Sequence, residues 1–155
     1  ELQENKLDRN YDFSSIVIKY SKTLEQEIYL FMKTLLKFLI EKNQRIENVS
    51  YSVQSKNYTV KDIFTNKPNF GTYKFILKED IVKTVMESNL DKVLLFFIQK
   101  KLVAYINFIQ EIRNETVHGR PATLNEANSV RAKILGVAQE SILIELIKNK
   151  KMITK

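Results

Sequence analysis

The chain has 155 residues, a length that suits one domain built around a single hydrophobic core. It has no cysteine, which excludes disulfide bridges and thiolate metal sites, and only three glycines and two prolines, which favours long helices over a many-stranded sheet. Its formal net charge of +7 fits either a solvated lysine-rich surface or a surface that binds an anionic partner.

The location of the protein is predicted from what the sequence lacks. No apolar run approaches the roughly 18 residues needed to cross a bilayer, and no signal peptide is recognisable. We therefore expect a cytoplasmic protein without a membrane partner. Residues 1–155 are treated as one domain, which can belong to a larger parent protein.

Residues 12–43 are predicted to form one long amphipathic helix that begins at Asp12 as N-cap. At 1.5 Å per residue it would extend over about 45 Å and form the spine of the fold. Apolar residues recur along it at three- and four-residue steps: Ile16, Val17, Tyr20, Leu24, Ile28, Phe31, Leu35 and Leu39. The other face of the helix carries Lys19, Lys22, Glu25, Lys33 and Lys37.

Residues 44–71 are rich in Asn, Ser, Thr and Tyr, and their weak alternation indicates a loop or a short hairpin. One helical turn is expected from Thr59 to Phe64, because Thr59 and Asp62 match a capping box.

Two helices should follow, over residues 73–87 and from residue 90 to about His118, with a break at Ser88-Asn89. The second is apolar on most sides, which predicts that it is buried by its own domain or by a second copy. Gly119 and Pro121 are expected to end it.

The last helix is predicted to start at a second capping box, formed by Thr123 and Glu126, and to end in a frayed basic tail over residues 148–155. Its expected core face comprises Val130, Ile134, Val137, Ile142, Leu143 and Leu146. The predicted fold is therefore all-α, a helical bundle of four main helices with a short insertion between the first and the second.

Polar residues gather where the most apolar helix is expected to end, in the segment EIRNETVHGRPAT at residues 111–123. Asn114 and His118 are four residues apart and share a helical face, whereas Arg113 lies about 140° around the axis. One interpretation is structural, because cationic side chains at a helix C-terminus interact favourably with the helix dipole. The other is a functional site.

The motif formed by Arg113, Asn114 and His118, R-N-x-x-x-H, resembles the signature of the HEPN superfamily. Members are all-helical bundles, many of them metal-independent ribonucleases of toxin–antitoxin, abortive-infection, CRISPR-associated and RNA-processing systems. The resemblance extends over residues 12–147, with the motif as its specific part. Arg120 stands where toxins partnered with a nucleotidyltransferase antitoxin often have tyrosine, which argues against that subtype.

The resemblance implies that Arg113, Asn114 and His118 form the active site and that two copies dimerise with their motifs facing a shared cleft. The chemistry agrees, because metal-free RNA cleavage needs proton transfer and positive charge on the phosphorane. We assign His118 as general acid or base, Arg113 as phosphate clamp and Asn114 as orienting residue. Arg120 and Arg131 are candidate RNA contacts, each of which could equally be a solvated surface residue.

The resulting prediction is a metal-independent endoribonuclease, active as a homodimer in a prokaryotic defence or toxin system, with RNA as partner and an antitoxin or further domains as possible additional ones. With one histidine and no cysteine, no metal site or cofactor is expected. Two alternatives stay open. One is a non-catalytic helical module that binds RNA, a nucleotide or a protein, and the other is a structural dimerisation domain.

Overall fold

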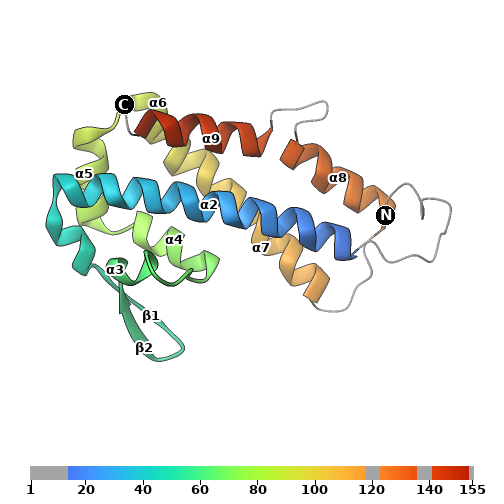
Figure 1. Cartoon of the computed structure of the whole chain (residues 1–155), viewed down its shortest axis with the longest axis horizontal. Helices are drawn as coiled ribbons and strands as arrows, with labels where there is room; N and C mark the ends of the chain where they lie inside the picture. The colour runs from blue at the N-terminus through green and yellow to red at the C-terminus, as the bar shows by residue number, and fades with distance from the viewer. Residues whose placement is uncertain (1–13, 118–122, 136–140, 154–155) are drawn as a thin grey trace.

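The computed structural model describes residues 14–117, 123–135 and 141–153. Its architecture is all-α apart from one two-stranded sheet, as predicted (Figure 1). Helix α2 (Ser14–Lys42) runs through the middle of the molecule and packs against α7, α8 and α9. At 29 residues it is about 44 Å long, which confirms the predicted spine. The predicted N-cap Asp12 lies outside the described residues.

Helix α2 is buried on a wider face than the predicted stripe. Because several helices cover it, a second series joins the predicted apolar positions in the interior: Ser21, Glu25, Tyr29, Met32 and Leu36. Glu25 is therefore not on the polar face of an amphipathic helix, as the sequence pattern suggested. It is 8% exposed and belongs to the rim of the core.

The segment after α2 contains the short hairpin that was one of the two alternatives. A 3-10 turn, η1 (Gln44–Asn48), leads into β1 (Ser50–Val53) and β2 (Lys56–Thr59), which pair antiparallel. Gln54 and Ser55 form the two-residue turn, and both have positive φ, as the right-handed twist of a tight hairpin favours.

Thr59 ends β2 and begins the helical turn α3 (Val60–Ile63). The predicted capping box is confirmed, with the Thr59 backbone N–H donating to the Asp62 carboxylate at 2.8 Å.

The helix expected over residues 73–87 is two helices, α4 (Phe70–Leu77) and α5 (Asp80–Asn89). The prediction of one helix was wrong because Glu79 adopts an extended conformation between them, with ψ of 135°. No glycine or proline marks this break in the sequence. The predicted helix break at Ser88-Asn89 is confirmed, because α5 ends at Asn89.

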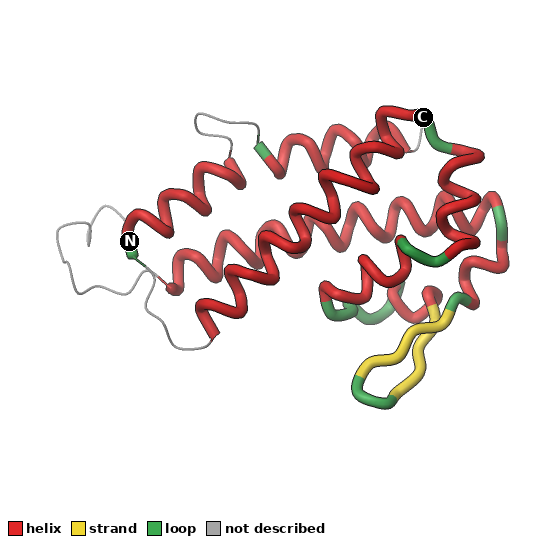
Figure 2. The backbone as a smooth tube through the Cα atoms, turned by 180° about the vertical axis from the view of Figure 1, so that it is seen from behind, coloured by secondary structure: helices red, strands yellow, loops and turns green. Residues whose placement is uncertain are grey.

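The next helical stretch runs without interruption from Lys92 to Val117 and crosses the molecule diagonally (Figure 2). It consists of α6 (Lys92–Phe96), a π-helical turn η2 (Phe97–Leu102) and α7 (Val103–Val117). One side is buried: Leu94, Phe97, Ile98, Leu102, Ile106 and Ile109. Val93 and Phe96 are 70% and 57% exposed. The predicted burial on most sides is therefore not found within this one chain.

This stretch corrects one sequence expectation. By length and composition, Lys92–Arg113 is apolar enough to cross a bilayer, with a mean hydropathy of 1.3 over its most apolar window. One third of that window is buried inside the protein. The core helix of a globular domain has the same composition, so the finding is weak evidence for a membrane span. The helix stops predicted at Gly119 and Pro121 lie outside the described residues.

The last predicted helix is also two helices, α8 (Leu124–Leu135) and α9 (Ile142–Ile153), which follow one another along α2 (Figure 1). The capping contact of the second box is present, because the Glu126 N–H donates to the Thr123 hydroxyl at 3.2 Å. Ser141 caps α9 in the same way, accepting from the Ile144 N–H at 3.2 Å.

The expected core face of this region is partly confirmed. Val130, Ile134, Ile142 and Leu146 are buried and Leu143 is half-buried, while Val137 lies outside the described residues. The expectation of a frayed tail is wrong for residues 148–153, because α9 continues to Ile153, which is 2% exposed.

Candidate functional site

Two residues of the predicted motif lie in the last turns of α7. Arg113 is described with its side chain, and Asn114 with its backbone position only. His118 and Arg120 lie outside the described residues. The structure therefore establishes the helix that carries the motif and the surroundings of its arginine.

Arg113 forms an ion pair with Glu25 of α2, in which guanidinium Nη1 donates to carboxylate Oε1. The Glu25 side chain is 11% exposed, whereas the Arg113 side chain is 53% exposed. A carboxylate withdrawn from water to this extent needs a charged or hydrogen-bonding partner, and the arginine provides it. The pair joins α2 to α7 at the rim of the core.

The position of Arg113 follows from the buried stripe that runs from the end of η2 into α7. Leu102, Ile106 and Ile109 face the core, and Arg113 comes four residues after Ile109 on the same side of the helix. The arginine thus continues an apolar stripe at the place where α7 passes the buried carboxylate. Its aliphatic stem can lie along the core rim while its charged end remains half-exposed.

The neighbouring face of α7 packs against α4. Lys74 Nζ donates to Asn107 Oδ1 at 2.7 Å, and Gly71 lies beside the Gln110 side chain, where a Cβ would make an ordinary van der Waals contact at 3.6 Å from the amide nitrogen. By the helical repeat, position 114 lies on the side of α7 that carries Asn107 and Gln110. Arg113 and Asn114 therefore occupy adjacent faces of one helix end.

A group of polar side chains lies on the interior side of the ion pair. Ser21, one turn before Glu25 on α2, is 2% exposed, and Tyr73 of α4 is 1% exposed. Burial, reinforced by the nearby Tyr29 and Glu25, raises the pKa of Tyr73 well above its usual value, so its hydroxyl stays protonated. Among the described residues, neither hydroxyl has a hydrogen-bond partner.

Arg131 is exposed on the outer side of α8, whose buried side is formed by Ala127, Val130 and Ile134. The basic residue of α8 that contacts α7 is instead Lys133, whose Nζ lies 4.4 Å from the centre of the Phe108 ring. The structure brings Arg113 together with Glu25, and no contact between Arg113 and Arg131 is found among the described residues.

Sequence reasoning missed Glu25 and Lys133 as members of this region. The predicted apolar stripe of the first helix leaves Glu25 on the face that carries the lysines. The signal that marks Glu25 as buried is a second stripe at four-residue steps, formed by Ser21, Glu25 and Tyr29. Lys133 gave no such signal, because its contact depends on how α8 docks against α7.

No family model matches the chain, and no curated protein or solved structure matches it. The local geometry therefore stands alone. At the end of α7, the half-exposed guanidinium of Arg113 forms an ion pair with the buried carboxylate of Glu25. A guanidinium has five N–H donors, and the bond to Glu25 uses one of them. Such a group is suited to bind a phosphate or carboxylate from solvent.

Proposed function

We propose that this chain is a metal-independent endoribonuclease whose active site contains Arg113, Asn114 and His118. The observation that supports it best is the orientation of Arg113: a buried carboxylate fixes one side of a guanidinium that is half-exposed at the motif-bearing helix end. Pre-organised positive charge is what a developing phosphorane requires. The R-N-x-x-x-H spacing supplies the other two groups.

The proposed reaction is transphosphorylation. A general base takes the proton of the ribose 2′-hydroxyl, the 2′-oxygen attacks phosphorus, and the 5′-oxygen leaves with a proton from a general acid. His118 serves as one of these two groups, and Arg113 donates hydrogen bonds to the non-bridging oxygens. The products are a 2′,3′-cyclic phosphate and a 5′-hydroxyl.

One copy of the chain has one histidine, and a single histidine does not easily fill both proton-transfer roles. We therefore propose a homodimer in which two motifs form one composite site. The net charge of +7 supports RNA as the partner, with Arg120 and Arg131 as further phosphate contacts. The proposed setting is a cytoplasmic prokaryotic defence or toxin system, in which an antitoxin or further domains restrain the activity.

The test is cleavage of an end-labelled RNA in EDTA by the wild type, by three variants of the motif and by one control variant. His118→Ala and Arg113→Ala should each lower the rate by about 100-fold or more, the cost of removing one group that stabilises the transition state. Arg113→Lys can still pair with Glu25 but lacks the planar fork, so it should also be impaired. Arg45→Ala, at an exposed arginine of η1, is the matched control.

The ion pair also supports a second, non-catalytic function, because Arg113 already has a partner within the chain, Glu25. An arginine that only neutralises Glu25 would suit a non-catalytic module that binds RNA, a nucleotide or a protein. That function predicts salt-dependent RNA binding without cyclic phosphate products and with full tolerance of His118→Ala. Equal cleavage by the wild type and all three variants would reject the endoribonuclease.

A further inference from the structure

An apolar groove lies between the start of the Lys92–Val117 stretch and α9, at the end of this stretch away from Arg113. It has a volume of about 490 Å³ and is lined by residues of α6, η2 and α9. Three of its apolar residues are largely exposed, namely Val93 at 70%, Phe96 at 57% and Ile144 at 65%. Phe96 and Arg113 are 17 residues apart, about 25 Å along a helix.

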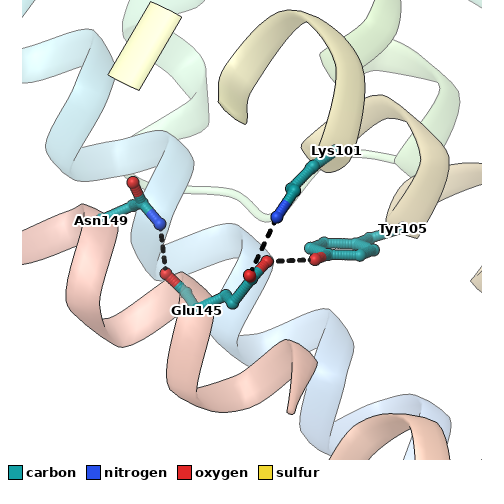
Figure 3. Close-up of polar contacts among 4 residues, drawn as sticks. All are labelled: Lys101, Tyr105, Glu145 and Asn149. Carbon is teal, nitrogen blue, oxygen red and sulfur yellow. Dashed lines mark hydrogen bonds and ion pairs between the residues drawn. The ribbon is translucent and has the colours of Figure 1, made fainter. Parts of the chain in front are cut away.

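The walls of the groove are fixed to one another by polar contacts (Figure 3). Lys101 Nζ lies 3.0 Å from Oε1 of Glu145 on α9, and the Tyr105 hydroxyl donates to the other oxygen of the same carboxylate. Within α9, the Asn149 side chain donates to the Glu145 backbone carbonyl at 2.8 Å. Because Lys101 and Tyr105 both bind Glu145, the two walls form a pre-organised groove, which lowers the entropic cost of binding.

The surroundings of the groove are strongly basic. The segment Lys92–Lys101 and helix α9 together contain six lysines and one glutamate, which gives a net charge of +5 on 22 residues. The glutamate, Glu145, is already engaged by Lys101 and Tyr105, and one of the six lysines, Lys150, lies 3.7 Å from the Glu27 carboxylate of α2. Lys148 of α9 lines the groove, and on the opposite wall the exposed Lys100 comes four residues after Phe96.

We propose that this groove binds an amphipathic helix of a partner protein, with an apolar stripe flanked by acidic residues. The two walls are helices, so a third helix can pack between them with its apolar side chains against Val93, Phe96 and Ile144. Its acidic flanks would face the lysines on both sides, which steers association and sets orientation. The concave shape favours a helix over a flat lipid surface, and the exposed aliphatic side chains favour it over RNA.

The test uses the full chain and two synthetic peptides of 18 residues. Both carry leucines at helical spacing, one with glutamates and the other with lysines on the flanking positions, and each contains one tryptophan. Because the chain has no tryptophan, the emission of the peptide reports binding directly. The glutamate peptide should bind at least about tenfold more tightly than the lysine peptide, and Lys148→Glu should reduce this preference.

A matched pair of substitutions locates the binding. Phe96→Ser should weaken the glutamate peptide about tenfold, whereas Phe75→Ser, at a phenylalanine of α4 that is 52% exposed, should leave its affinity unchanged. Both sites are exposed, so circular dichroism and thermal melts should show intact folds. The proposal is overturned if the glutamate peptide does not bind or if both substitutions act alike. It is also overturned if Phe96→Ser abolishes only binding to phosphatidylserine vesicles or only self-association in sedimentation.

Discussion

The stretch Lys92–Val117 has two ends that depart from ordinary burial in opposite directions. Near Arg113, a carboxylate is withdrawn into the rim of the core, and the same chain supplies the cation that compensates it. Near Phe96, apolar side chains remain exposed, and none of the described residues covers them. At the Arg113 end, the buried charge is compensated within the chain, and the half-exposed guanidinium has further N–H donors. The second end has a fixed shape and exposed apolar side chains, which are the surface that the proposed partner helix would cover.

The largest expected loss of stability comes from one of two adjacent phenylalanines at the groove, Phe97, and the other, Phe96, is its control. Phe97 is 3% exposed and packs 5.6 Å from Phe31, measured between ring centres, so Phe97→Ala should lower the free energy of unfolding by about 3–5 kcal/mol. Phe96→Ala removes the same atoms from an exposed ring and should change it by no more than about 0.5 kcal/mol. Urea denaturation of the two variants measures both values. A large loss at Phe96 would mean that the groove is closed in solution.

Local signals explain why some elements were predicted from the sequence. The capping boxes at Thr59 and Thr123 were found because a hydroxyl and a carboxylate three residues apart act within one helical turn. The hairpin stayed one of two alternatives, because Gln54-Ser55 lacks the Asn or Gly that usually marks such turns. The break at Glu79 has no sequence marker, and tertiary packing decides it.

The motif of the candidate site could be predicted from the sequence, whereas the contacts that surround it could not. The spacing of Arg113, Asn114 and His118 is visible in the sequence, but the ion pair joins residues 88 positions apart. The periodicity of α2 alone could not show that other helices would cover its second stripe. For the same reason, the groove could not be predicted, since it depends on the separation of α8 from α9 and on the docking of α9 against α6.

An intermediate effect on stability should come from the ion pair itself. Arg113→Ala leaves the Glu25 carboxylate buried without its partner and should lower the free energy of unfolding by about 1.5–3 kcal/mol. Glu25→Gln should cost less, because the amide oxygen can still accept from the half-exposed arginine. Adding Glu25→Gln to Arg113→Ala should therefore restore stability, since a neutral side chain then occupies the buried position.

Chemical denaturation of the two single variants and the double variant gives this cycle. If the losses of unfolding free energy in Arg113→Ala and Glu25→Gln simply add in the double variant, the buried carboxylate does not depend on Arg113. The Arg113 end of the stretch would then not be compensated internally. Glu25→Asp is a further comparison, because it keeps the charge on a shorter side chain. In the RNA assay, a lower kcat at unchanged KM for Glu25→Gln, partly recovered in Glu25→Asp, would identify Glu25 as a positioning residue for Arg113.

The smallest effect concerns Tyr73, which tests how far the polar end extends into the core. Its hydroxyl is buried, with no partner among the described residues, so Tyr73→Phe should leave the free energy of unfolding at neutral pH unchanged or raise it by up to about 1 kcal/mol. A loss of stability would show that the hydroxyl makes a hydrogen bond.

The same variant should behave differently in alkali. Because burial raises the pKa of Tyr73 in the folded state, the unfolded chain loses this proton near pH 10 while the folded chain retains it. The folded state then binds more protons, so its stability falls as the pH rises above 10. Removing the hydroxyl removes this contribution, and the free energy of unfolding of Tyr73→Phe should decline less steeply there than that of the wild type. Tyr51, whose pKa burial also raises, remains in the variant and should preserve part of the slope. Identical slopes in urea titrations across this range would mean that Tyr73 is open to water, and with it the interior side of the Glu25–Arg113 pair.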